Sequence, residues 1–284
     1  MRWEDEERSE NVEDRRGMPA SRGLIGGGIG TLFIVLLALY FGVDPGTLLQ
    51  TVPDPGPSQT NWQQPQQLDP NDEMAQFVSV VLADTEKTWH RIFDYYGKTY
   101  EEPKLVLFSG AVQSACGFAE AAMGPFYCPG DQKVYIDLSF YEDLKNRFHA
   151  PGDFAQAYVI AHEVGHHVQN LLGIMEKAQS AMQRARREEA NRISVKLELQ
   201  ADCFAGVWGH YADRVRHLLE VGDLEEALGA ASAIGDDRVM RQKTGTVVPD
   251  AFTHGSSAQR VKWFRRGFES GDINRCNTFE DATL

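Results

Sequence analysis

The sequence predicts a helix-rich α+β domain with a small β-sheet, preceded by one transmembrane helix. Two observations carry this prediction. Residues 23–43 form an uncharged apolar run, and from residue 71 onward apolar residues recur mostly at helical spacing, with only short stretches that favour strands. The chain has 284 residues, 42% of them hydrophobic, which is enough for one domain of about 200 residues with a buried core.

The run at residues 23–43 predicts a membrane-spanning helix, because its roughly 30 Å length as a helix matches the thickness of a bilayer core. The alternatives are a cleaved signal peptide and a buried soluble helix. An acid-rich segment precedes the run and no small-x-small cleavage site follows it, which disfavours a signal peptide. Six glycines within the run disfavour a soluble helix.

Positive charges set the expected orientation of this helix. Arg15, Arg16 and Arg22 precede it, and no Lys or Arg follows until Lys87. Because Lys and Arg next to a span stay in the cytoplasm, we expect residues 1–22 to form a cytoplasmic segment and the rest of the chain to lie outside the cytoplasm.

Residues 44–70 predict an extended linker. They hold six of the chain's 12 prolines and six glutamines, and such a segment cannot bury enough apolar surface to fold. We therefore expect the folded domain to span residues 71–284.

The domain begins with a predicted helix and continues with short strands. Apolar residues at near-helical spacing run through residues 74–97, and Gly97 is a plausible end of that helix. KLVLF at 104–108 predicts a strand, and GPFYC at 124–128 and KVYIDL at 133–138 predict a hairpin around a Pro-Gly turn. The remainder predicts helices separated by glycines and Asp-rich turns.

The charge of the chain excludes one class of partner. It has 41 acidic and 28 basic residues and a net charge of −13. Proteins that bind DNA or RNA neutralise phosphates with a basic face. We therefore expect no nucleic-acid partner.

The motif HEVGH predicts a metal site. On a helix His162 and His166 share one face and can bind one zinc ion, and Glu163 lies beside them. Zinc held by such ligands lowers the pKa of its water to about 7, and a carboxylate can take the proton of that water. The alternative is two core histidines on an ordinary helix. His167 lies off this face, so we expect it to pack or to hydrogen-bond rather than to bind the metal.

A catalytic zinc needs a third protein ligand. Gln169 and Leu172 stand where the metzincin pattern requires a Gly and a His, so that class is excluded. Glu198 and Asp202, spaced four residues apart in an apolar stretch, are the candidates. Glu198 would complete the ligand set, and Asp202 would accept a hydrogen bond from a ligand imidazole, most simply that of His162. Two solvated acids are the alternative.

This arrangement resembles that of the gluzincins, in which an ExxxD helix follows HExxH. More closely, the chain from about residue 72 to 278 resembles the bacterial putative neutral zinc metallopeptidase family, which also begins with an Arg-rich segment and one membrane span. The resemblance implies a zincin-like peptidase fold, and it implies no particular substrate. The matching segments are CGFAEAAMGPFYCPGDQKVYIDLSF, AHEVGHHVQNLLG, LELQADCFAGVWGHYA, AIGDDR and HGSSAQRVKWFRRGF.

His254 is a further candidate for the site. It lies before a predicted helix that Ser256 or Ser257 could cap, and by analogy with other zinc peptidases it would donate to the oxyanion of the transition state. The alternative is that His254 only orders its loop. Arg260 could pair with an acid near the metal, but the sequence assigns it no partner.

The four cysteines fit a domain outside the cytoplasm. Of the three possible pairings we expect Cys116 with Cys128 and Cys203 with Cys276, because the first closes a local loop and the second ties the C-terminal end to the helix of Glu198. Four reduced thiols are the alternative if the expected orientation is wrong.

Together these features predict a membrane-anchored metallopeptidase with one zinc ion, in which Glu163 activates a water. A peptide or protein substrate would lie along the edge of the small sheet. Two other functions keep the same metal residues: a zinc hydrolase of non-protein envelope amides, and a non-catalytic zinc-binding envelope protein. The sequence leaves the physiological substrate and the oligomeric state open.

Overall fold

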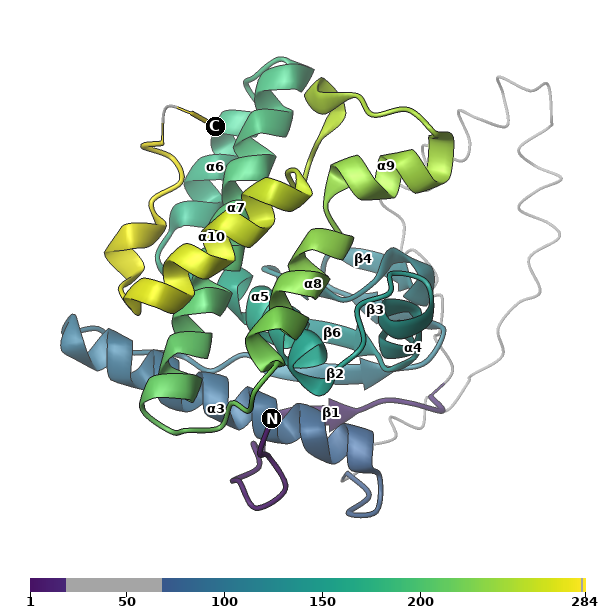
Figure 1. Ribbon diagram of the computed structural model, residues 1–284, viewed down its shortest axis with the longest axis vertical. Helices are drawn as coiled ribbons and strands as arrows, with labels where there is room; N and C mark the ends of the chain where they lie inside the picture. The colour runs from purple at the N-terminus through teal and green to yellow at the C-terminus, as the bar shows by residue number, and fades with distance from the viewer. Residues whose placement is uncertain (19–67, 282) are drawn as a thin grey trace, which may run out of the picture.

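The computed structural model describes residues 1–18, 68–281 and 283–284. These residues form a helix-rich α+β domain with small sheets, which confirms this part of the predicted fold (Figure 1). Among the helices described, none is both long and apolar enough to cross a bilayer. The predicted span at 23–43 lies outside the described residues, as does the linker at 44–70 except for its last three residues.

The main sheet has four strands in the order β1-β2-β6-β5. β2 pairs in parallel with β1 and with β6, and β5 pairs antiparallel with β6, so β1 and β5 are the edges. The strands are β1 (Val12–Asp14), β2 (Lys104–Phe108), β5 (Phe126–Cys128) and β6 (Lys133–Asp137), and a separate hairpin consists of β3 (Ala111–Ser114) and β4 (Gly117–Glu120). The strand at 104–108 and the β5–β6 hairpin confirm the prediction.

Side chains alternate between the two faces of this sheet. Leu105 and Leu107 of β2 belong to the main core, which the sheet shares with the helices. Val106 and Phe108 point to the other face, where Val112 of the β3–β4 hairpin packs on them. Because both faces are covered, β2 is a continuous apolar run, as expected for a parallel central strand.

Helices make up the rest of the domain. They are α3 (Glu73–Tyr95), α4 (Ser139–Asn146), α5 (Asp153–Leu171), α6 (Ile174–Met182), α7 (Arg187–Arg214), α8 (Asp223–Ala233), α9 (Asp236–Thr244) and α10 (Ser257–Ser270), with short 3₁₀ turns at Ala121–Met123, Pro249–Ala251 and Ile273–Cys276. α7 packs against both α5 and α10. Figure 1 shows α10 crossing α7.

Glycines let these helices approach closely. A Cβ atom on Gly165 of α5 would lie only 3.0 Å from the carbonyl oxygen of Ala201 in α7. A Cβ on Gly267 of α10 would overlap the carbonyl of Cys203 in α7, at 1.9 Å. The α10–α7 contact at Gly267 is possible only without a side chain, and the α5–α7 contact at Gly165 leaves little room for one.

The N-terminal residues differ from the expectation of a separate segment. Residues 1–18 pack on the domain, and β1 is an edge of its main sheet. Glu13 accepts from Lys133 at 2.8 Å, Arg16 pairs with Asp72 at 2.7 Å, and Trp3 lies edge-on against Phe77. β1 could not be predicted from the sequence, because this strand has only three residues, is not apolar, and pairs with a strand some ninety positions later.

Both predicted disulfides form. Cys116, in the turn between β3 and β4, is bonded to Cys128 at the end of β5. Cys203 of α7 is bonded to Cys276, 73 positions later, near the C-terminal end. The first holds the small hairpin against the sheet edge, and the second holds the C-terminal turn against the helix that carries Glu198.

Candidate metal centre

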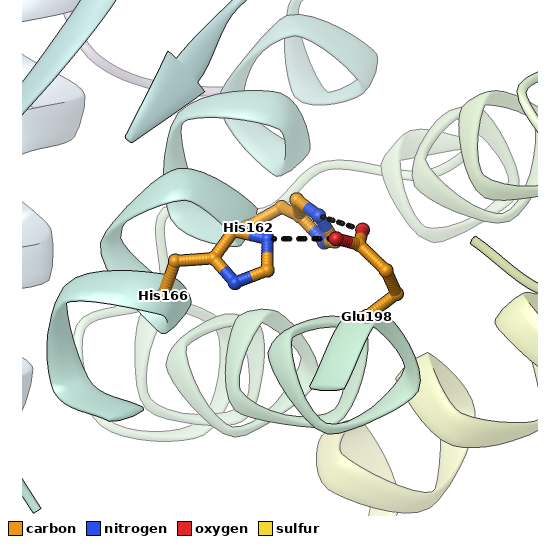
Figure 2. A group of neighbouring side chains, drawn as sticks. All are labelled: His162, His166 and Glu198. Atoms are coloured by element: carbon orange, nitrogen blue, oxygen red, sulfur yellow. Dashed lines mark hydrogen bonds and ion pairs between the residues drawn. The ribbon is translucent and has the colours of Figure 1, made fainter. Parts of the chain in front are cut away.

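Three side chains from two helices converge on one point. His162 and His166 lie one turn apart on α5, and Glu198 faces them from α7 (Figure 2). Nε2 of His162 lies 3.2 Å from one Glu198 oxygen, and Nε2 of His166 lies 3.5 Å from the other. The ligand atoms of the three residues all lie within 4.8 Å of one another, which is a spacing that one metal ion can bridge.

A buried network orients His162. Its Nδ1 lies 2.9 Å from Asp202, which is fully buried and also accepts from the hydroxyl of Tyr158. Arg260 of α10 donates from Nε and Nη2 to the two oxygens of Asp202, each at 2.8 Å. Because Asp202 can only accept, His162 donates from Nδ1, and Nε2 is the ring nitrogen that faces Glu198 and would bind a metal ion. The structure thus gives Arg260 the partner that the sequence left open.

A glutamine orients His166 in the same way. Nδ1 of His166 lies 2.9 Å from Oε1 of Gln169, and Nε2 of Gln169 donates to the carbonyl of Leu197 in α7 at 2.7 Å. The side-chain oxygen of the amide accepts, so His166 donates from Nδ1 and its Nε2 is the nitrogen that faces Glu198. The role of Gln169 was not predicted from the sequence. The feature that indicates it is a polar residue three positions after His166 on an otherwise apolar helix face.

Charge compensation links the three residues. Burial disfavours the charged form of His162, but Asp202 and Glu198 raise its pKa to about 10. Burial opposes ionisation of Glu198 too, yet the two histidines hold its pKa well below the usual value. The site is therefore built to hold an anionic carboxylate beside positive charge. A bound dication supplies that charge, so this donor set of two nitrogens and one carboxylate fits zinc.

Glu163 lies in the same hollow as the three candidate ligands. The hollow is a cleft of about 740 Å³, lined also by Phe126 and Tyr127 of the edge strand β5. The Glu163 side chain is largely buried, with 8% of the residue exposed. The arrangement places a carboxylate, a metal-binding group and a strand edge around one space that is open to solvent.

His254 also lines this cleft, and it lies in the loop before α10. Its Nδ1 lies 3.2 Å from Asp236, and the other oxygen of Asp236 accepts from the backbone N–H groups of Thr253, His254 and Gly255. This hydrogen bond raises the pKa of His254. Ser256 caps α10 by a capping box, as the sequence predicted. Asp236 was not predicted, because its partners lie about eighteen positions away.

His167 does not belong to the metal group, as predicted. Its Nε2 donates to the carbonyl of Glu101 at 2.6 Å, so Nδ1 accepts from the hydroxyl of Tyr127 at 3.0 Å. Burial lowers the pKa of His167 to about 4, which keeps the ring neutral. Asn170 donates to the same Tyr127 hydroxyl. These bonds hold β5 against the helix that carries the candidate ligands.

The role of Asp202 is testable by metal binding. We expect Asp202→Asn to weaken zinc binding by about tenfold to a hundredfold, because the amide no longer fixes and polarises His162 as a carboxylate does. Competition with a chromogenic chelator measures the affinity. Asp213→Asn, at a partly exposed position of the same helix far from the centre in sequence, is the control and should bind zinc as the parent does. Equal affinity of the Asp202 variant and the parent would contradict this role.

The comparisons with known proteins agree with this centre. Over residues 1–279 the chain matches the family described as "Putative neutral zinc metallopeptidase". YpfJ of Escherichia coli strain K12 is 53% identical over 289 residues, 98% of this chain and 99% of that protein. Rv2575 of Mycobacterium tuberculosis strain H37Rv is 41% identical over 272 residues, 87% of this chain and 86% of that protein. Neither relative has a name that states an activity.

No solved structure shows a significant match. The family match nevertheless extends over nearly the whole chain, and the matched range includes the three candidate ligands and Glu163. The chain belongs to the putative neutral zinc metallopeptidase family.

Proposed function

We propose that the chain is a zinc-dependent peptidase of the zincin type. The observation that carries this proposal is the convergence of His162, His166 and Glu198 in a cleft that also holds Glu163 and the free edge of a strand. These three residues would hold the zinc ion. Asp202 and Gln169 direct both histidine Nε2 atoms into the cleft, which is the donor geometry that zinc requires.

The chemistry proposed for the cleft is peptide hydrolysis. Zinc, when bound there, supplies a Lewis acid that makes a water acidic near neutral pH. Glu163 takes a proton from that water as its oxygen attacks the peptide carbonyl carbon, and it passes the proton to the amine when the C–N bond breaks. His254 donates a hydrogen bond to the carbonyl oxygen as negative charge develops on it.

The edge strand β5 provides a place for the substrate backbone. Within the described sheet, β5 pairs only with β6, so its outer edge has unpaired N–H and C=O groups. Phe126 and Tyr127 of this strand line the cleft. An extended peptide that pairs with this edge would bring a carbonyl to the candidate ligands, a mode of binding that needs a flexible chain rather than a folded one.

We further propose that residues 23–43 anchor the chain in a membrane, with the catalytic domain outside the cytoplasm. The apolar run supports the anchor. The two disulfides support the location of the domain, because such bonds persist in oxidising compartments. Residues 1–18 dock on the same domain, so a cytoplasmic N-terminal segment requires β1 to be separated from β2 when the chain inserts.

The function of Glu163 is tested by Glu163→Gln. We expect hydrolysis of unfolded protein substrates to fall by roughly 10²- to 10⁴-fold, because the amide cannot accept the proton of the water. Zinc content, measured by elemental analysis, should stay at the parent value. Glu176→Gln, an exposed position on α6, is the control. Hydrolysis at the parent rate by the Glu163 variant, for every substrate, would refute the proposal. Zinc binding without any hydrolysis by the parent would indicate a non-catalytic zinc protein.

The pH dependence of the activity tests His254. The hydrogen bond to the Asp236 carboxylate raises the pKa of His254, so the donating, protonated form persists to higher pH. Asp236→Asn keeps an oxygen that can accept the backbone N–H groups but removes the charge. We expect the alkaline limb of the profile of kcat/KM against pH to move to lower pH. His254→Gln should lower kcat/KM by about 10²-fold and lose this limb. An unmoved limb in the Asp236 variant would exclude His254 as the donor.

The orientation is tested by a cysteine at position 7, which is exposed in the docked segment. We expect Glu7→Cys in the full chain to be protected from a membrane-impermeant maleimide in intact cells and labelled after permeabilisation. Glu188→Cys, in the domain, should be labelled without permeabilisation. Labelling of position 7 from outside would contradict the cytoplasmic N-terminus and would show that β1 stays docked in the membrane-attached protein.

A further inference from the structure

The methionines of the domain are concentrated around the cleft. The chain has seven methionines, and every one beyond residue 74 lines this cleft. They are Met123, Met175, Met182 and Met240. They come from three separate elements: the 3₁₀ turn after β4, then α6, then α9. Four of the seven methionines thus line this one cleft, and we call these four side chains the methionine wall.

Three of these four side chains are not core residues. Met123 is 72% exposed, and Met182 and Met240 are half-buried, as is Phe140, whereas Met175 is buried with 8% exposed. Apolar side chains that face a solvent-filled hollow cost free energy unless a ligand covers them. The lining of the cleft therefore combines charged groups, among them the candidate ligands and Glu163, with partly exposed apolar side chains.

Methionine gives such a wall a particular property. Its side chain is unbranched and polarisable, with three rotatable bonds, so it adapts to apolar groups of different shape. A wall of Leu, Ile or Val would be stiffer and would select one shape. A volume of about 740 Å³ is within the range of ligand-binding pockets and leaves space for large side chains beside an extended backbone.

We propose that this cleft selects extended polypeptide segments with large apolar side chains, and that it tolerates Leu, Phe and Met alike. Such segments are buried in folded proteins and exposed in unfolded ones. The substrate class is therefore non-native protein, recognised by its main chain along β5 and by its apolar side chains on the methionine wall. This inference rests on the proposed function, because it deepens the description of the same site.

Peptide binding tests the inference separately from hydrolysis. The full-length, zinc-loaded chain with Glu163→Gln is titrated with fluorescein-labelled octapeptides that carry a central pair of Leu, Phe, Met, Ala or Asp. We expect the Leu, Phe and Met peptides to bind within about threefold of one another. We expect each to bind at least about tenfold more tightly than the Ala and Asp peptides, a ratio typical of apolar pockets.

Three variants in this background locate the preference. Met182→Gln with Met240→Gln keeps side-chain length but adds polar atoms, and should reduce the apolar preference to about threefold or less. Met182→Leu with Met240→Leu should keep the preference. Met74→Gln, on α3 and outside the cleft, should leave every affinity unchanged. Equal binding of the Leu and Asp peptides, or a preference unaffected by the paired Gln substitutions, would overturn the inference.

The two failures are distinguishable. If the parent chain hydrolyses peptides but the Glu163→Gln chain binds apolar and charged peptides equally, the proposed function holds and the methionine wall has no selective role. If apolar peptides bind selectively but the parent hydrolyses none of them, the cleft recognises non-native segments and the proposed peptidase activity fails.

Discussion

The close packing of α5 on α7 is the constraint on which the rest of the site depends. Gly165 lies between the two histidines of the motif, and its missing side chain lets Ala201 of α7 approach to contact distance. At this separation Glu198 lies within 3.2–3.5 Å of both imidazoles. A Cβ atom at position 165 would meet the backbone of Ala201 at 3.0 Å, so α7 would have to shift by a few tenths of an ångström. The motif thus supplies two candidate ligands and also a close contact with the helix that carries the third.

Asp202 extends this contact to the C-terminal part of the domain. It accepts hydrogen bonds from Tyr158 and His162 on α5 and from Arg260 on α10, and all four residues are buried. Burial of an unpaired carboxylate would be costly, so the arginine that neutralises Asp202 is as necessary as the histidine it orients. The disulfide from Cys203 and the close approach at Gly267 hold α10 and the C-terminal turn in place around the same helix.

The N-terminal strand β1 belongs to the folded domain, although the predicted membrane span follows it in the chain. The family match begins at residue 1, and β1 belongs to the same sheet as the edge strand of the cleft. β5 is held by the disulfide of Cys128, by His167 and by Asn170. β1 is held by three residue pairs and by the partly buried ion pairs of Glu13 with Lys133 and of Arg16 with Asp72. Of the two edge strands, β1 is the one next to the predicted span along the chain.

Local patterns in the sequence were sufficient for much of the site. The spacing of His162, Glu163 and His166 determined that they share a helix and a face, and the apolar stretch around Glu198 marked the second helix. The β5–β6 hairpin and the cap at Ser256 were also readable, because turn and cap signals depend on neighbours along the chain.

The sequence by itself therefore determined the helix-rich fold class, the metal-binding motif and the cysteine pairs, all of which depend on spacing or on few alternatives. Only the tertiary structure decided the partners of Arg260, Gln169 and Asp236, the place of β1, and the gathering of methionines from three elements around one cleft. The physical reason is distance along the chain: hydrogen bonds and strand pairs between residues some twenty to ninety positions apart leave no periodic trace, because they depend on how the helices and the sheet pack.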